Sequence, residues 1–200
     1  MAIELVSRRE RKKLAQRHSI REETIALIGR YGIEGTTIDA ICDCADIAKK
    51  TFYNYYGSKQ DLLLDICQTM LLQRADTLID EAMSHSPELG RQLDHIFAVM
   101  NQRQQEAGKL ERELFDYMVS SLSSNLEAGA GQLTFMNRCF QRLYDAAEAQ
   151  LRPGLTPQFC AEMTVGMINA VTLNWLHDNH YDTAQKYRML RDHIKYSMLR

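Results

Sequence analysis

Apolar residues recur along this chain every three or four positions, the spacing that places them on one face of a helix. The pattern predicts nine helices and no strand, so the expected fold class is all-α. The predicted helices span residues 7–31, 37–45, 48–55, 58–83, 87–108, 110–122, 133–151, 157–178 and 183–200. The segment 123–131 consists mainly of small and polar residues and contains glycine, and we expect a loop or an irregular helix start there.

Capping residues support several of these helix starts. Thr37 and Thr183 are good N-caps, and Ser58 with Asp61 three residues later approximates a capping box. Pro157 stands at the first position of a helix, where its missing N–H costs nothing. The breaks between helices are therefore predicted from local chemistry as well as from periodicity.

Two short helices joined by a tight turn are predicted within residues 37–55. The turn is Asp46-Ile47, and the first helix has apolar residues at the helical positions Ile38, Ile41, Cys42 and Ala45. This is the layout of a helix-turn-helix, whose second helix lies in the major groove of DNA. A plain helical hairpin that carries lysines by chance is the alternative interpretation.

Charge is distributed unevenly along the chain. The formal net charge is -2, but residues 1–60 have a net charge of +3 and residues 61–200 a net charge of -5. Six of the ten residues from Arg8 to Arg17 are basic. A basic end on an acidic body suggests a localised contact with a polyanion, although a charge run can equally be a solvated surface.

The turn and its flanks also match a known pattern. The matching strings are Gly35-Thr36-Thr37-Ile38-Asp39-Ala40-Ile41, then Ala45-Asp46-Ile47-Ala48-Lys49-Lys50-Thr51-Phe52-Tyr53-Asn54-Tyr55-Tyr56, then Ser58-Lys59-Gln60-Asp61-Leu62-Leu63. Over about fifty contiguous residues the chain resembles the TetR family of bacterial transcriptional regulators. The resemblance implies a homodimer with one helix-turn-helix per subunit, and repression of genes that a small molecule usually relieves.

Two positions depart from the family pattern. Asp46 stands where the family usually has a glycine, and Asp tolerates the left-handed conformation better than most residues. Ala48 replaces the usual serine, which removes an N-cap and a hydroxyl that would contact phosphate. We therefore expect DNA binding to depend more on Lys49, Lys50 and the basic segment.

The second short helix and its surroundings supply the candidate DNA contacts. Lys49 and Lys50 can reach base edges or phosphates, and Asn54 can bind adenine through two hydrogen bonds. Phe52 and Tyr56 are expected to pack inward. The resemblance implies that Lys59 binds a phosphate group of the DNA backbone. The full candidate set is Arg17, Arg21, Thr37, Lys49, Lys50, Thr51, Tyr53, Asn54, Tyr55 and Lys59.

We expect residues 1–58 to form the DNA-binding domain and residues 59–200 a helical domain for ligand binding and dimerisation. Helical bundles bind small molecules between helices, and methionine lines adaptable pockets. The candidate ligand-binding residues are Phe97, Met100, Phe115, Met118, Phe140, Tyr144, Met163 and Met167. Each of them could instead simply fill the core. Candidate polar contacts are His95, Asn101, Arg103, Gln104 and Tyr117, among which the spacing does not select.

The last two helices are the candidate dimer interface, as the family resemblance implies. Small residues one turn apart allow close approach of helices, and an apolar stripe follows on the final helix. The candidate interface residues are Gly166, Ala170, Trp175, Tyr187, Leu190, Ile194 and Met198. The alternative is that both stripes pack inside one subunit.

Enzyme chemistry is not indicated. No Glu stands three residues before any of the six histidines, as a helical di-metal enzyme would need, and no local signature of a catalytic triad is present. Cys42 and Cys44 are too close in sequence for a redox pair, and the five scattered cysteines suggest reduced, packed thiols. We therefore expect no enzyme activity, metal or cofactor.

Location and partners complete the expectations. The chain has no apolar run of the roughly 18 residues that a membrane span needs, and no signal peptide is visible. The expected protein is cytoplasmic, with palindromic double-stranded DNA, a second copy of itself and an unidentified apolar or amphipathic ligand as partners. The alternative is a DNA-binding protein of the same family that has no inducer and acts architecturally or by recruiting another protein.

Overall fold

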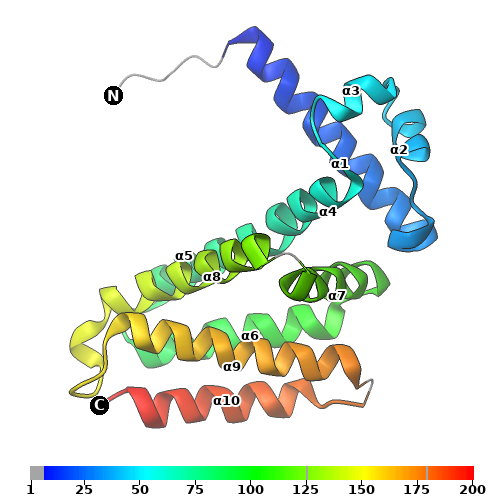
Figure 1. Cartoon of the computed structure of the whole chain (residues 1–200). Helices are drawn as coiled ribbons and strands as arrows, with labels where there is room; N and C mark the ends of the chain where they lie inside the picture. Colours follow the sequence, from blue (N-terminus) through cyan, green and yellow to red (C-terminus); the bar gives the residue numbers. More distant parts are fainter. Residues whose placement is uncertain (1–6, 125, 179) are drawn as a thin grey trace. The chain divides into compact units, whose positions relative to one another are not determined.

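The computed structural model describes residues 7–124, 126–178 and 180–200, and the regular structure of this part is helical (Figure 1). The elements are α1 (Arg8–Gly35), α2 (Ile38–Cys44), α3 (Lys49–Tyr53), α4 (Lys59–Cys67), the π-helical turn η1 (Gln68–Leu72), α5 (Gln73–His85), α6 (Leu89–Glu106), α7 (Lys109–Ser124), α8 (Leu126–Ala146), the 3-10 turn η2 (Glu148–Gln150), α9 (Pro157–His177) and α10 (Thr183–Met198). The predicted all-α class is confirmed. Because α4, η1 and α5 follow one another without a break, the described residues contain the nine predicted helices and the short turn η2.

The chain divides into two compact units. The first consists of residues 7–66 together with Lys109–Leu114, and the second of Cys67–Gly108 and Phe115–Arg200. The chain therefore passes from one unit to the other within the helical segment 59–85, next to η1, and again within α7. A π-helical turn inside an α-helix is uncommon and is often found at functional positions.

In the first unit, α1 to α4 share one apolar core. The buried side chains are Ile20, Thr24, Leu27 and Ile28 of α1, Ile41 and Cys42 of α2, Phe52 of α3, Tyr56, and Leu62, Leu63 and Ile66 of α4. The inward packing expected for Phe52 and Tyr56 is confirmed. Leu14 and Tyr31, which flank these positions of α1 on either side, are exposed.

The first helix, predicted to end at residue 31, instead continues through a kink at Gly32. Gly32 has φ 74° and ψ 170°, after which the helix continues for one further turn to Gly35. A φ in this range suits glycine, because a side chain there would be strained. The kink interrupts the backbone hydrogen bonding of the helix, so the groups of its last turn need other partners.

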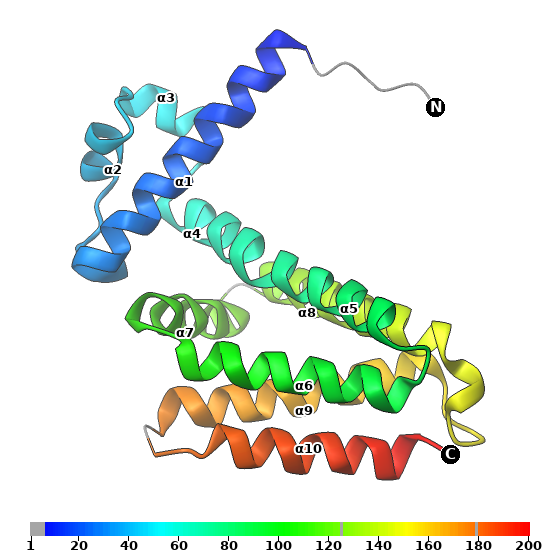
Figure 2. The ribbon, with the colours of Figure 1, turned by 180° about the vertical axis from the view of Figure 1, so that it is seen from behind.

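The second unit is built from α5, α6, α8, α9 and α10 (Figure 2). The helix α8 packs along α9, and α10 packs against both α6 and α9. Tyr144 of α8 is completely buried at the centre of this packing, with its hydroxyl 2.7 Å from that of Thr164 in α9. Leu151 and Leu199 form an isolated β-bridge that ties the segment after α8 to the end of α10.

The segment between α7 and α8 is more helical than the sequence predicts. The expected loop or irregular start covered residues 123–131, whereas α7 extends to Ser124 and α8 begins at Leu126, and residue 125 lies outside the described part. Glycine inside a helix costs only about 1 kcal/mol relative to alanine. Leu126, Ala128 and Ala130 are good helix formers that offset this cost, so a helix starts within the segment and the alternative of a loop up to residue 131 was wrong.

Most predicted helix caps are present. The hydroxyls of Thr37, Ser58 and Thr156 accept hydrogen bonds from the backbone N–H three residues later, at 3.1–3.2 Å. At the last helix the cap is Asp182 and not the predicted Thr183, because the Asp182 carboxylate accepts the N–H of Gln185 at 2.9 Å. Because each cap is formed by a side chain within three residues of the group it binds, the helix starts are determined by the local sequence.

All five cysteines are reduced. Cys44 is exposed, whereas Cys42, Cys67, Cys139 and Cys160 are buried. Burial raises the pKa of the Cys67 and Cys139 thiols to about 12, with the carboxylate of Asp76 adding to the effect at Cys139. The four buried thiols are therefore packing groups. Among the described residues, no helix is long and apolar enough to cross a membrane.

Candidate functional site

The turn between α2 and α3 has the geometry that a helix-turn-helix needs. Asp46 has φ 50°, so the predicted left-handed conformation of this residue is confirmed. The N–H of Ile47 donates to the carbonyl of Cys42 at 3.0 Å, which closes the turn. At the start of α3, Ala48 makes no side-chain cap, as expected from the missing serine. The direction of α3 is thus fixed by the turn backbone and by burial of Phe52.

The outer face of α3 carries the polar candidates. Lys49 and Lys50 are exposed, and Lys49 forms an ion pair with Asp39 of α2, which raises the pKa of its ammonium group. Lys50 has no ion-pair partner among the described residues. Tyr53 is exposed, and its ring packs edge-on against Phe52 at 5.5 Å between centroids. Thr51 is half-buried. Buried Phe52 thus supports a polar surface on the opposite side of this helix.

Several further DNA candidates surround α3. Asn54 is exposed at its C-terminal cap, and Tyr55 is half-buried. Thr37 is exposed, but its hydroxyl caps α2. The ammonium group of Lys59 donates to the carbonyls of Ile33 at 2.9 Å and Thr36 at 3.0 Å. In this structure Lys59 therefore satisfies carbonyls at the end of α1, a role that sequence reasoning did not foresee.

Arg17 and Arg21 converge on a carboxylate that the sequence analysis missed. Arg17 donates to Asp65 of α4 at 3.0 Å and to the hydroxyl of Tyr56 at 3.2 Å, and Arg21 lies 3.4 Å from the same carboxylate. The Tyr56 hydroxyl donates to Asp65 at 2.6 Å. Burial and this hydrogen bond raise the pKa of Tyr56 to about 12. The two arginines thus join α1 to α4 through Asp65.

Glu113 of α7 is a second missed residue. Its carboxylate accepts the N–H of Ile33 at 2.9 Å, immediately after the kink at Gly32. The same residue, Ile33, gives its carbonyl to Lys59 of α4. The last turn of α1 is therefore held by two side chains, one from α4 and one from α7. Both of these helices lead into the second unit.

The candidate ligand residues occupy different environments in the second unit. Phe97, Met118, Phe140 and Tyr144 are buried, whereas Met100, Phe115 and Met167 are half-buried. The ring of Phe115 packs edge-on against Trp175 at 6.0 Å between centroids. Met163 is exposed on α9, so it does not line the interior, and its assignment to a pocket was wrong. Periodicity did not reveal this because α9 carries apolar residues on more than one face.

Four amide side chains in the described part of this unit have buried oxygens without a hydrogen-bond partner. They are Gln92, Asn101 and Gln104 of α6 and Asn137 of α8, and of these Gln92 donates its amide nitrogen to the carbonyl of Ser86. Asn101 and Gln104 follow the buried Phe97, and Asn137 precedes the buried Phe140 by one turn. Buried polar atoms almost always have a partner, so each of these needs an explanation such as bound water or a bound ligand. Of the predicted polar candidates, Asn101 and Gln104 have such an amide oxygen and His95 has a buried ring nitrogen of this kind, and the structure adds Gln92 and Asn137.

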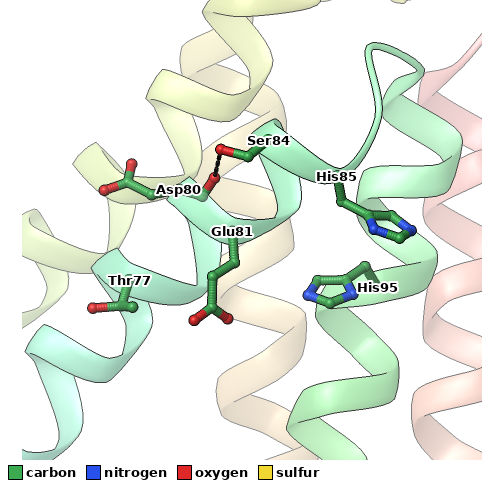
Figure 3. Close-up of a pocket in the computed structure, with 6 residues that line it drawn as sticks. All are labelled: Thr77, Asp80, Glu81, Ser84, His85 and His95. Carbon is green, nitrogen blue, oxygen red and sulfur yellow. Dashed lines mark hydrogen bonds between the residues drawn. The ribbon is translucent and has the colours of Figure 1, made fainter.

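A shallow depression of about 490 Å³ lies on the surface of α5 and α6 (Figure 3). Its lining residues are Thr77, Asp80, Glu81, Ser84, His85 and His95. The imidazole rings of His85 and His95 stack with their centroids 5.0 Å apart, and Nε2 of His95 is buried without a partner. Within the described ranges no three His, Cys, Asp or Glu side chains are placed to hold a metal ion.

The candidate interface residues fall into two groups. Tyr187, Leu190, Ile194 and Met198 of α10 and Trp175 of α9 are buried within this one chain, in contact with its own helices. A second subunit cannot pack on side chains that are already covered, so their assignment to a dimer surface is corrected. Gly166 and Ala170 are exposed, and nothing lies within 4 Å of where a Cβ on Gly166 would stand.

An exposed apolar stripe runs along α9. It consists of Phe159, Met163, Gly166, Ala170 and Leu173, whose spacing of four, three, four and three residues is that of a helix–helix seam. On α10, Met189 and Tyr196 are also exposed, Tyr196 to 79%. Sequence reasoning found the small residues of this stripe but not its large members.

Two short helices joined by the Asp46 turn, with α1 packed behind them, define a helix-turn-helix protein with a second, all-helical unit. Residues 20–66 match the family described as "Bacterial regulatory proteins, tetR family". The chain is 24% identical over 145 residues to the uncharacterized HTH-type transcriptional regulator YhgD of Bacillus subtilis (strain 168), covering 60% of this chain and 72% of that protein.

Solved structures show the same fold. The FadR repressor of Thermus thermophilus, in complex with lauroyl-CoA, matches with a TM-score of 0.75 and 19% identity, over 92% of this chain and 95% of FadR. SmeT, the repressor of the Stenotrophomonas maltophilia efflux pump SmeDEF, matches with a TM-score of 0.68 and 17% identity, over 92% of this chain and 90% of SmeT. Residues 20–66 thus carry the DNA-binding segment of the TetR family of bacterial regulatory proteins, and the chain shares the fold of these solved repressors.

Proposed function

We propose that this protein is a homodimeric, sequence-specific DNA-binding repressor that a small uncharged amphipathic molecule releases from its operator. The observation that carries the proposal is the face of α3, where Lys50 is exposed without an ion-pair partner among the described residues, on a helix oriented by the Asp46 turn. Such a helix fits the major groove and can read base edges there. Lys49, Thr51, Tyr53, Asn54 and Tyr55 are the further proposed contacts on and after α3.

The roles proposed for Arg17, Arg21, Thr37 and Lys59 are different. The side chains of these four residues already have partners within the protein. We propose that the first two contact phosphate from their engaged position, where the pairing with Asp65 limits their movement. Thr37 and Lys59 serve mainly to hold the ends of α1 and α2. Specificity then depends on α3, while these residues position it.

The operator can be found by selection from a random pool of DNA duplexes with the whole chain, followed by titration at several salt concentrations. We expect a near-palindromic site, because a two-fold symmetric dimer reads two equivalent half-sites. Lys50→Ala should weaken binding by ~1–3 kcal/mol per half-site and relax one base position if it reads a base. Arg91→Ala, which removes an exposed cation of α6, is the matched control and should leave affinity unchanged. Selection of no duplex by the wild-type chain would refute the proposal.

The proposed dimer forms through the exposed stripe of α9 together with Met189 and Tyr196 of α10. Heptad-like spacing with small residues in the middle lets two helices approach closely, and two helices from each subunit give a four-helix bundle. The buried residues of α10 support this surface from behind, because they hold α10 on α6 and α9.

The proposed ligand site is the interior of the second unit near Phe97, Met100, Phe115, Met118, Phe140 and Met167. Its polar groups are the amides of Asn101, Gln104 and Asn137, and no Asp, Glu, Lys or Arg among the described residues is fully buried. An ion that entered this core would lose its hydration without gaining a counter-charge, which costs several kcal/mol. A neutral molecule with an apolar body and a hydrogen-bonding group satisfies the amides without that cost.

A thermal-shift series with one alkyl chain and different head groups tests this choice. Decanol and decanamide should raise the melting temperature, whereas decanoate and decyltrimethylammonium should not. Gln104→Met should abolish the preference for the polar head group. Gln102→Met is the matched control, because Gln102 is an exposed neighbour on the same helix. Equal shifts with the charged members would contradict an uncharged ligand.

Release requires that ligand binding weaken DNA binding. We propose that the signal passes along the chain through α4, η1 and α5 and through α7, since these segments run between the units. Lys59 and Glu113, which hold the last turn of α1, are the proposed receiving groups. Coupling of this kind is reciprocal and typically amounts to ~1–3 kcal/mol, so operator DNA must weaken ligand binding by the same factor.

A further inference from the structure

The first two turns of α1 carry a dense set of cations without partners. Arg8, Arg9, Arg11, Lys12 and Lys13 are all exposed, and in the described part of the chain none of them forms an ion pair or hydrogen bond through its side chain. The other cations near the DNA-reading helix are mostly engaged, as the contacts of Arg17, Arg21 and Lys59 show. Besides these five, only Arg30 and Lys50 are unpaired cations in the described part of the first unit, so its unpaired positive charge is concentrated in this one patch, which we call the basic turns.

The basic turns gain little stability from the rest of the protein. All residues from Ser7 to Ala15 are exposed, so no tertiary packing holds this part of the helix. Cations in the first turn of a helix, such as Arg8, Arg9 and Arg11, also face the positive end of the helix dipole, which is unfavourable. The opposing contribution is a capping box between Ser7 and Glu10, whose two hydrogen bonds lower the pKa of Glu10.

Such an arrangement is unfavourable for the isolated protein and becomes favourable when an anion neutralises the cations. The patch is polar throughout, because residues 8–13 include no apolar side chain. A membrane surface would require an apolar face on the helix to insert between lipids, which this segment lacks. The backbone of a nucleic acid requires only closely spaced cations.

The position of the basic turns in the protein indicates which nucleic acid they bind. They belong to the same helix whose residues Ile20, Leu27 and Ile28 are buried in the core shared with α2 and α3. We propose that the basic turns bind phosphates of the operator duplex outside the bases read by α3, and that this binding stabilises their helix. This inference rests on the proposed DNA-binding function. A helix rises 1.5 Å per residue, so the segment from Arg8 to Ile20 reaches about 18 Å, or about 5 base pairs of duplex.

The test combines a charge-removal variant with operators of two lengths. The variant replaces Arg8, Arg9, Arg11, Lys12 and Lys13 with Gln, which keeps a good helix former at each position. Each lost phosphate contact lowers the slope of log affinity against log salt by about 0.9, so two to five contacts per subunit lower it by about 4–9 in a dimer. We expect this reduction for both the selected operator and altered-sequence operators, because phosphate contacts carry no base preference.

Operator length provides a second measurement. Removing the base pairs outside the selected site should weaken the wild-type chain at low salt but should have no effect on the charge-removal variant. A charge-preserving control with Arg8→Lys, Arg9→Lys and Arg11→Lys should behave as the wild type. Circular dichroism should show a gain of helix when the wild-type chain binds the long operator and a smaller gain with the short one. Unchanged thermal stability of the Gln variant would show that the fold is intact.

The outcomes separate this inference from the proposed function. Equal salt slopes and equal length dependence for the two chains would overturn the inference while leaving operator binding in place. Binding of the basic turns to anionic phospholipid vesicles, without any effect of the Gln variant on operator affinity, would overturn it in favour of a membrane. Failure of the wild-type chain to select any duplex would overturn the proposed function itself.

Discussion

The turn residue Asp46 allows a test in which the same substitution has opposite effects at two nearby positions. Asp46 adopts φ 50°, a region that costs an ordinary L-residue ~1–2 kcal/mol and Asp somewhat less. Glycine removes this cost but makes the unfolded chain more flexible, which lowers stability by ~0.4–1 kcal/mol. Because Asp46 is exposed, packing does not enter the balance. Asp46→Gly should therefore be neutral or stabilising by up to ~1 kcal/mol.

Asp43 is the matched control, because it is also exposed but lies within α2. Glycine within a helix costs about 1 kcal/mol, so Asp43→Gly should be destabilising. Asp46→Val should be clearly destabilising, because a branched side chain tolerates a positive φ poorly. Urea unfolding followed by circular dichroism measures all three variants. If Asp46→Gly lost as much stability as Asp43→Gly, the turn would not have the backbone conformation on which the argument depends.

Three further predictions concern the contacts between helices. Asp65→Asn removes the charged acceptor shared by two arginines and Tyr56, and should lower the free energy of unfolding by ~1–3 kcal/mol in urea melts. A loss below that range would mean that the network contributes little. The pKa of Tyr56 and of Tyr187 is raised to about 12 from an ordinary value near 10, so folding stability should fall as pH rises through this window, by about 1.4 kcal/mol per pH unit for each tyrosine. Tyr56→Phe should reduce this slope, and an unchanged slope would contradict the assignment. Leu173→Glu should convert the proposed dimer to a monomer in sedimentation measurements without unfolding the protein, whereas an intact dimer would place the interface elsewhere.

The helix-turn-helix could be predicted from the sequence because its determinants are local. Thr37, Asp46 and the apolar positions of α2 act over a few residues, and the structure has the cap, the positive φ and the burial that they imply. The contacts that Lys59, Asp65 and Glu113 make with α1 and its C-cap could not be predicted, because each joins residues 23–80 positions apart. An acidic residue one turn after the buried Leu62 was the available signal for Asp65.

The interface illustrates a different limit. Periodicity shows that a helix has an apolar face but not whether that face meets the same chain or another one. Tyr187 and Ile194 lie on one apolar face of α10 in the sequence pattern, and helices of their own subunit cover them. Phe159 and Leu173 of α9, in contrast, are exposed. The deciding information is tertiary, because α10 can bury only the side that packs on α6 and α9.

The distribution of thiols makes the molecule ready for spectroscopy. A maleimide reagent at neutral pH needs an accessible thiol, and Cys44 is the exposed one of the five. It stands at the C-terminal end of α2, two residues before Asp46. In the proposed dimer a single labelling step would therefore attach one spin probe to the helix-turn-helix of each subunit. No cysteine would have to be replaced by mutation beforehand. The distance between the two probes could then be measured as operator or ligand is added. This distance reports the movement of the two helix-turn-helix segments directly, and not only its effect on DNA affinity.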